Sequence, residues 1–169
     1  VKQTSLSLLM VTKAGVGKKT AAKNFHDVRR SGLIAITLRG DDELVSASFV
    51  EKGDEAVLVT AKGQSIRFKE SDIREMGRGA SGVRVMRLRK GDAIVGTGII
   101  SKKTDHPELL VIMENGYGKR TDLKAFKTQR RAGKGIKAAK VTSKTGKIVL
   151  AQIVDPEQKE LIVISKKGQ

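Results

Sequence analysis

The chain has 169 residues, with 34 Lys and Arg against 18 Asp and Glu, so its formal net charge is +16. It contains no Cys, which excludes disulfide scaffolds, cysteine-ligated zinc, iron–sulfur clusters and thiol nucleophiles. No apolar run approaches the roughly 18 residues of a membrane-spanning helix, and the length allows one domain or a run of small units.

The first predicted unit covers about residues 6–50 and holds three elements. It opens with LLMVTKAGVGKKT (8–20), an apolar run, a turn at Gly15 and a second run, which is the pattern of a β-hairpin. The second element is RRSGLIAITL (29–38), where apolar residues alternate with others as in a half-buried strand. The third, DDELVSASFV (41–50), is apolar enough to lie in a covered sheet.

The same three elements return in the same order. The second unit spans about 56–100, the third about 109–154, and a partial fourth lies at 161–169. The elements of the second unit read VLVTAKGQSIRF (57–68), GASGVRVMRL (79–88) and GDAIVGTGII (91–100); those of the third read LVIMENGYGKRT (110–121), AGKGIKAAKV (132–141) and GKIVLAQIV (146–154), and LIVISKKGQ (161–169) repeats part of the first element. Three landmarks recurring in one order indicate an internal repeat.

This recurrence predicts an all-β fold. Each unit supplies about four strands, two in the hairpin and one in each later element, and only residues 21–28 and 69–75 could hold a helical turn. Repeat units of this size cannot bury their faces alone, so neighbouring units must share a core, as blades packed around an axis do. Because the sequence stops inside the first hairpin of a fourth copy, we expect a piece of a longer array.

The charge indicates a polyanionic partner. Aromatic residues make up only 3% of the chain, whereas single-strand binders offer aromatic stacking platforms, so a duplex backbone is favoured. A membrane surface is disfavoured because no long amphipathic helix is evident. From Asn115 to Lys147 there are eleven cations and one acid, Asp122, which makes this stretch the expected centre of binding.

Cations also recur on the second strand of each predicted hairpin. They are Lys18, Lys19, Arg67, Lys119 and Arg120. Recurrence at one position predicts a basic outer rim; the alternative is that these are ordinary exposed-strand residues, which also protect sheet edges from pairing.

Four segments carry a family resemblance. They are KKTAAKNFHDVRRSGLIAITL (18–38), IRFKESDIREMGRGASGVRVMRL (66–88), NGYGKRTDLKAF (115–126) and QRRAGKGIKAAKV (129–141). Over essentially its whole length the chain resembles part of the C-terminal domain of the bacterial DNA gyrase A subunit. The corresponding domain of topoisomerase IV shares the architecture with more degenerate repeats and is the alternative. The resemblance implies a β-pinwheel, a propeller-like disc of four-stranded blades with DNA bent around its basic rim.

The family has a wrapping motif of the form Gln-basic-Arg-Gly-Gly-basic-Gly. Residues Gln129–Gly135 resemble it and depart from it at Ala132. Glycines let backbone N–H groups approach phosphates, and the cations neutralise them. Because the flanking sequence resembles a later blade, this copy either defines the wrap or only contacts DNA. The expected DNA-binding residues are Lys18, Lys19, Arg29, Arg30, Arg67, Arg78, Arg84, Lys119, Arg120, Gln129, Arg130, Arg131, Gly133, Lys134, Gly135 and Lys137.

The resemblance implies sequence-independent binding, bending and wrapping of double-stranded DNA. The partners it implies are the gyrase A core and the gyrase B subunit, in an enzyme that introduces negative supercoils with ATP and Mg²⁺ bound elsewhere. This chain itself is expected to have no catalytic site, no cofactor and no membrane contact. We expect a cytoplasmic, nucleoid-associated protein, because the first residues lack a signal peptide. A rival function is a basic propeller-like module that binds an acidic protein.

Two glycine-rich stretches resemble nucleotide-binding motifs but do not fit them. Lys13–Thr20 lacks the first glycine and the Ser or Thr of a P-loop, since Thr12 and Lys19 stand there. Gly77–Gly82 matches the dinucleotide pattern, but a polar stretch precedes it and a strand follows, so a plain loop is expected. Tyr117 lies in a hairpin turn, where packing or DNA contact is a better interpretation than catalysis.

Overall fold

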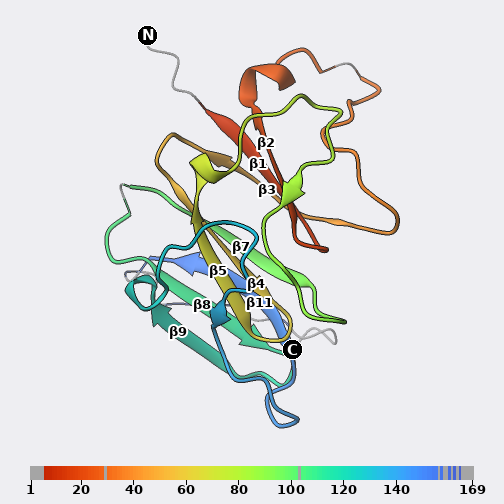
Figure 1. The fold of residues 1–169 in the computed structure, drawn as a ribbon. Helices are drawn as coiled ribbons and strands as arrows, with labels where there is room; N and C mark the ends of the chain where they lie inside the picture. Colours follow the sequence, from red (N-terminus) through yellow and green to blue (C-terminus); the bar gives the residue numbers. More distant parts are fainter. Residues whose placement is uncertain are drawn as a thin grey trace.

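The structure is a computed structural model that describes residues 6–28, 30–102 and 104–155, with 157, 160, 162 and 164. Within these residues the chain forms strands and three short 3-10 helices, and no α-helix (Figure 1). None of the helices in this part of the chain is long and apolar enough to cross a membrane.

The three predicted hairpins are confirmed. They are β1 (Ser7–Thr12) with β2 (Val16–Ala21), β4 (Glu55–Thr60) with β5 (Gln64–Lys69), and β8 (Glu108–Met113) with β9 (Gly118–Asp122), all antiparallel. Their turn glycines, Gly15, Gly63 and Gly116, have φ values of 79°, 86° and 81°, a region that costs residues with a side chain about 1–2 kcal/mol. The turns therefore need glycine, which is why it recurs there.

The third element of each repeat is also a strand, as predicted. β3 (Leu44–Val50), β7 (Ile94–Ile100) and β11 (Ile148–Val154) each pair with the first strand of their own hairpin. β7 packs between β3 and β11, and Thr97 donates a 2.7 Å hydrogen bond to the Ser46 hydroxyl. The middle strand of the three therefore contacts its equivalents in both neighbouring repeats.

The second element joins the sheet of the preceding repeat. β6 (Val83–Arg84) pairs with β2, and β10 (Ile136–Lys137) pairs with β5, so the sheets read β3-β1-β2-β6, β10-β5-β4-β7 and β11-β8-β9. Each of these strands is only two residues long. In the first repeat, residues 30–38 form no strand at all, and Ile34 is 72% exposed. The prediction of a strand there is wrong, because no preceding hairpin in the described chain offers it an edge.

Short 3-10 helices follow the hairpins. Ala22–Phe25 follows β2, Glu70–Asp72 follows β5, and Leu123–Ala125 follows β9. The first two lie where the sequence predicted a helical turn. After the second and third of these helices the chain runs along the hairpin of the preceding repeat, which positions the basic segments described below.

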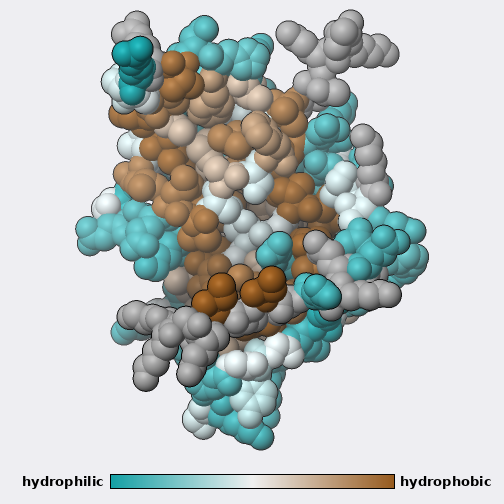
Figure 2. All heavy atoms as spheres, turned by 180° about the vertical axis from the view of Figure 1, so that it is seen from behind, coloured by the Kyte–Doolittle hydropathy of each residue, from teal (hydrophilic) through white to brown (hydrophobic). Residues whose placement is uncertain are grey.

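The core is shared between repeats, as expected. β4 lies between two clusters of buried residues: Ala56 and Leu58 belong to the cluster with the first repeat, and Val57 and Val59 to the cluster with the third. Alternate residues of a strand point to opposite faces, so this strand is covered on both sides. Figure 2 shows, in contrast, an apolar band on the outside of the molecule, seen from behind.

Candidate nucleic-acid interface

Lys18 is not on an exposed rim, and that prediction is wrong. Its side chain is completely buried, and its Nζ donates to the carbonyl of Ala35 at 2.6 Å and to that of Arg78. Burial lowers the pKa of Lys18 from its usual value of 10.5. The lysine thus ties the second element of the first repeat to the loop of the second repeat and is unavailable to a phosphate.

Lys19 and Arg67 occupy the same place in successive hairpins and are also covered. Lys19 is buried, forms an ion pair with Glu70 and donates to the Glu70 carbonyl at 3.3 Å. Arg67 is paired with Glu55, with 2.6 Å between Nε and Oε2. Lys19 is buried and Arg67 is half-buried, so the expectation of an exposed rim at these positions is wrong.

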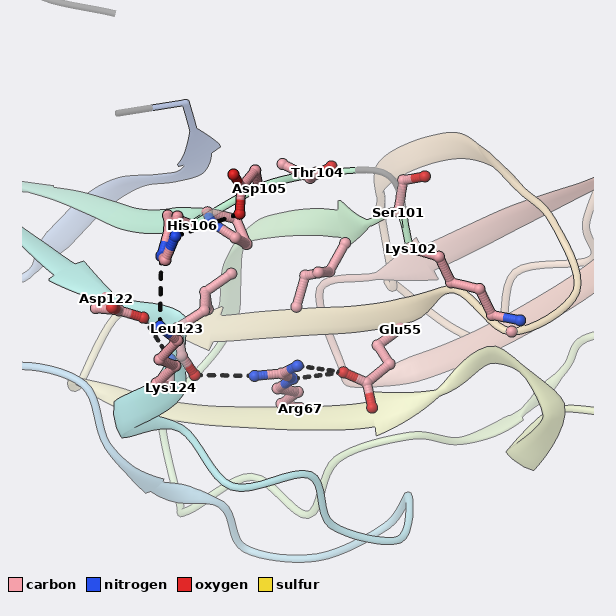
Figure 3. A pocket seen from close by; sticks show the side chains of 13 residues that line it. Glu55, Arg67, Ser101, Lys102, Thr104, Asp105, His106, Asp122, Leu123 and Lys124 are labelled. Atoms are coloured by element: carbon pink, nitrogen blue, oxygen red, sulfur yellow. Dashed lines mark hydrogen bonds and ion pairs between the residues drawn. The ribbon is translucent and has the colours of Figure 1, made fainter. Parts of the chain in front are cut away.

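The next repeat covers these cations because it runs along the outer edge of the hairpin. The backbone N–H of Met76 donates to the Lys19 carbonyl at 2.8 Å, and that of Gln129 donates to the Arg67 carbonyl at 2.7 Å. Arg67 also donates to the carbonyl of Leu123 at 2.9 Å, inside the 3-10 helix of the third repeat (Figure 3). At each junction a cation thus bonds to the next repeat and holds the two backbones together. We call such a contact between repeats a clamp.

A cavity of about 380 Å³ lies beside the Arg67 clamp (Figure 3). Its walls carry both signs of charge, with Glu55, Asp105 and Asp122 facing Arg67, Lys102 and Lys124. Lys124 Nζ lies 3.3 Å from Nδ1 of His106, which stands in the left-handed region with a φ of 43°. No group of three or more His, Asp or Glu able to hold a metal ion occurs in the described chain. The cavity is a junction between repeats rather than a basic site.

Lys119 and Arg120 are exposed, unlike their counterparts. Arg120 pairs with Glu108, with 2.6 Å between Nε and Oε2, and donates to the Asp155 carbonyl at 3.3 Å. The outer edge of β9 has no paired strand among the residues that the structure describes. The exposure of these two residues follows from that open edge.

The exposed cations gather on other segments, the second elements and the loops that lead into them. The loop at 77–82 lies over the first repeat, where the Thr37 N–H donates to the Ala80 carbonyl at 3.3 Å. The loop at 129–135 lies over the second repeat in the same way, with the Arg87 N–H donating to the Gly133 carbonyl at 2.9 Å. The segments of three repeats therefore lie next to one another.

We call the exposed cations of these adjoining segments the basic ridge. Residues 77–91 hold five cations and residues 127–147 hold eight, and neither stretch holds an Asp or Glu. The ridge consists of Arg30, Arg78, Arg84, Arg87, Arg89, Arg130, Lys134, Lys137 and Lys140, all of them exposed. The DNA-binding residues expected from the sequence do not include Arg87, Arg89 and Lys140. The run of cations without acids at 77–91 is a signal in the sequence that points to the first two.

The backbone of the motif at 129–135 mainly packs against the preceding repeat. Gly135 has a φ of 74°, and a side chain there would collide with the Ser65 carbonyl on β5. Gly82, the equivalent residue one repeat earlier, lies in the same way against Gly17, whose carbonyl oxygen would be 2.6 Å from a Cβ. These glycines allow close packing on the preceding hairpin, so the expectation that Gly135 opens the backbone to a phosphate is replaced by a packing role.

Ala132 is the departure from the family motif, and it is strained. Its φ is 65°, and its N–H donates to the Val85 carbonyl at 2.7 Å. A residue with a Cβ pays about 1–2 kcal/mol in this region, where the family motif has glycine. The loop thus keeps the glycine conformation without the glycine.

The two arginines of the motif differ. Arg131 is half-buried and donates to the carbonyls of Asp72 at 2.8 Å and Arg84 at 3.0 Å, so it joins the third repeat to the second. Arg130 is exposed and lies on the ridge, as does Lys134. Gln129 is half-buried, with its backbone bonded to Arg67, and Arg29 lies outside the described residues.

Comparisons with known proteins agree with this architecture. The family described as "DNA gyrase C-terminal domain, beta-propeller" matches residues 6–51, 54–101 and 107–155, one match for each repeat. The DNA gyrase A subunit of Lawsonia intracellularis is 41% identical over 157 residues, which cover 93% of this chain and 19% of that protein. The Staphylococcus epidermidis DNA gyrase A subunit is 38% identical over 161 residues, covering 95% of this chain and 18% of the relative. The chain thus spans about a fifth of the length of these curated relatives.

Solved structures show the same fold. A topoisomerase IV C-terminal domain matches with a TM-score of 0.83 and 29% identity, over 90% of this chain and 47% of the other. A DNA gyrase A C-terminal domain matches with a TM-score of 0.79 and 30% identity, over 90% of this chain and 50% of the other. The predicted all-β, propeller-like fold and the predicted resemblance are both confirmed. On the evidence of its three matched repeats and its fold, the chain belongs to the DNA gyrase C-terminal domain family of β-propellers.

Proposed function

We propose that this chain binds and bends double-stranded DNA along the basic ridge, as the DNA-binding module of a DNA gyrase A subunit. The observation that carries the proposal is the segregation of charge. The stretches 77–91 and 127–147 contain five and eight cations and no Asp or Glu. Backbone hydrogen bonds between the repeats hold the two stretches next to each other. A phosphate backbone is the polyanion that such a continuous surface fits.

The binding is independent of base sequence. The described chain has no α-helix to enter a major groove, and the ridge offers Arg and Lys, which position a backbone. Bending a site of 20–30 base pairs by 40–90° costs about 1–6 kcal/mol. Contacts distributed over three repeats can offset that cost.

In the whole enzyme this module wraps DNA. The gyrase A core and gyrase B supply strand passage and use ATP with Mg²⁺, and the complex acts on the bacterial nucleoid in the cytoplasm. This chain contributes no step of the chemistry. The ring centroid of Tyr117, in its exposed turn, lies 5.7 Å from the Lys144 Nζ, which supports a surface role for this tyrosine. A topoisomerase IV counterpart is supported by the structural match, whereas the curated relatives favour gyrase.

The salt dependence of DNA affinity tests the proposal. Fluorescence anisotropy with two unrelated 30-base-pair duplexes should give similar affinities. If about 6–10 phosphates are contacted, the affinity falls about 10³–10⁵-fold between 50 and 200 mM salt. A preference for one sequence, an affinity insensitive to salt, or tighter binding to an acidic protein would overturn the proposal in favour of the protein-interaction module.

Wrapping is tested by ligating nicked circular DNA in the presence of the protein. A shift of the linking number toward positive values supports a wrap of positive hand. Binding without any shift restricts the function of this chain to DNA contact and contradicts the wrapping part of the proposal.

A further inference from the structure

The turn of each hairpin is fastened to the loop that joins the second and third elements of the same repeat. In the first repeat the loop supplies a carboxylate, and Asp42 Oδ1 accepts the Ala14 N–H of the turn at 2.8 Å. In the second repeat Asp92 Oδ1 accepts the Lys62 N–H in the same way at 3.0 Å. These contacts hold each loop beside the tip of its own hairpin.

The third repeat reverses this arrangement, because its loop at 142–147 contains no Asp or Glu. Here the turn supplies the side chain, and Asn115 Nδ2 donates to the carbonyls of Ser143 at 3.2 Å and Lys144 at 2.9 Å. We call these two bonds the amide latch. Both acceptors are carbonyl oxygens, so the latch needs an N–H donor at position 115.

Asn115 is followed by glycine, and both residues are exposed. Asparagine is a thermolabile residue, because the backbone nitrogen of the next residue can attack its amide carbon, and a side chain on that next residue hinders the attack. Gly116 has no side chain, and its φ of 81° favours glycine at this position. The other asparagine of the chain, Asn24, is followed by Phe25. The amide that holds the loop is therefore the one more open to attack.

We propose that Asn115 is a site of spontaneous deamidation, and that its conversion releases the loop at 142–147 from the third hairpin. Hydroxide removes the N–H proton of Gly116, and the nitrogen forms a bond to Asn115 Cγ. The bond between Cγ and Nδ2 breaks, and Nδ2 leaves as ammonia after taking a proton from water, which restores the hydroxide. Water then opens the five-membered imide at either of its two carbonyls, which gives aspartate or isoaspartate.

The folded turn slows this reaction. The Gly116 N–H donates to the Met113 carbonyl at 3.0 Å, and the amide latch restrains the Asn115 side chain. Turns at the surface open locally at a low cost in free energy, and the attack takes place during such openings. Conversion is therefore slower in the folded chain than in the unfolded chain.

Both products lose the latch. A carboxylate has no N–H to donate, so aspartate at position 115 places a negative charge against the two carbonyl oxygens that the amide held. Isoaspartate also lengthens the backbone of the turn by a CH₂ group. The released loop carries Lys144 and Lys147, both exposed, and it follows Lys140 of the basic ridge. On the proposed function, on which this consequence rests, DNA binding weakens because these cations lose their fixed position.

Incubation of the chain at pH 9 and 37 °C, with peptide mass spectrometry at intervals, tests the chemical step. We expect release of ammonia and conversion of Asn115 to aspartate and isoaspartate, while Asn24 remains an amide. Conversion should be slower at pH 7, where hydroxide is scarcer, and faster at pH 9 in guanidinium chloride. An Asn115 that remains an amide in the folded chain at pH 9, or equal conversion of the two asparagines, would overturn the proposal.

Limited trypsin digestion tests the release of the loop, because cleavage after Lys144 and Lys147 requires the loop to open. Asn115→Asp reproduces one product, and Asn115→Ala removes the donor without adding charge. Both variants should be cleaved faster than wild type in this loop. Asn24→Asp, an equal change of charge at the other exposed asparagine, is the matched control and should be cleaved like wild type. Cleavage of Asn115→Asp at the wild-type rate would overturn the release.

DNA titrations between 50 and 200 mM salt separate this proposal from the proposed function. Asn115→Asp should reduce the slope of log affinity against log salt by about 1–2, since each lost phosphate contact removes about 0.9. Asn24→Asp should keep the wild-type slope. A wild-type slope for Asn115→Asp would overturn the link between this loop and DNA. A wild-type chain whose affinity is insensitive to salt would instead overturn the proposed function and leave the deamidation standing.

Discussion

Arg130 and Arg131 are neighbours with opposite roles, and substituting each with Ala separates fold from binding. Arg131 donates two hydrogen bonds to backbone carbonyls of the second repeat. Hydrogen bonds from charged groups contribute about 1.5–3 kcal/mol when buried. Arg131 is only half-buried, so we take about 1 kcal/mol for each bond and expect Arg131→Ala to lower the free energy of unfolding by about 2 kcal/mol. For a chain of this size, about 2 kcal/mol lowers the Tm by about 4–8 °C.

Arg130→Ala should leave the Tm unchanged, because surface substitutions usually alter stability by less than about 0.5 kcal/mol. It should instead weaken DNA binding and reduce the slope of log affinity against log salt by about 0.9, the effect of one phosphate contact. Differential scanning calorimetry and DNA titrations of both variants are the measurements. If both variants lose DNA affinity equally and keep the wild-type Tm, the clamp assigned to Arg131 is wrong.

Three further predictions concern the interior of the repeats. Burial lowers the pKa of Lys18, so between that lowered pKa and 10.5 the unfolded chain holds the proton on this lysine more often than the folded chain does. The free energy of unfolding of wild type, relative to that of Lys18→Met, should therefore rise with pH through this range. Urea melts at pH 7 to 10 measure this difference, and a difference that does not change with pH would contradict the prediction. Ala132→Gly relieves a left-handed Ala and should raise the free energy of unfolding by about 0.5–1 kcal/mol after the entropy of the added glycine; a loss of stability in the same melts would refute the strain. Gly135→Ala should cost more than Gly32→Ala, because both have a φ of 74° and only Gly135 lies against a carbonyl; equal losses of Tm would show that packing contributes nothing.

The sequence revealed the hairpins and the third strands because their apolar runs and turn glycines recur in order. It did not reveal which sheet the second element joins, since alternation at 83–88 describes a face and names no partner. The described chain has no hairpin before the first repeat, which explains why the clean alternation of Ile34, Ile36 and Leu38 produced no strand. Local pattern predicts a strand, but an edge from another repeat is needed to make one.

The clamps were hidden for a related reason. Lys18 and Lys19 stand among polar neighbours on a strand, a pattern typical of a solvent-facing edge. They are buried, and they contact residues distant in the sequence: Ala35 and Arg78 for Lys18, and Glu70 for Lys19. Arg130 and Arg131 are likewise adjacent and chemically identical in sequence, and the backbone of the second repeat alone distinguishes them. The charge of the chain predicts a polyanionic partner, but the position of each cation depends on contacts between repeats that the charge does not reveal.

The central claim is that position on the ridge, rather than net charge, determines DNA binding. Two triple variants with the same change of charge test it in DNA titrations at several salt concentrations between 50 and 200 mM: Arg84, Arg130 and Lys134 to Ala on the ridge, and Lys23, Lys52 and Lys69 to Ala at exposed sites elsewhere. We predict that the ridge variant reduces the salt slope by about 2–3, while the other variant keeps nearly the wild-type slope and affinity. Equal losses in the two variants would contradict the claim.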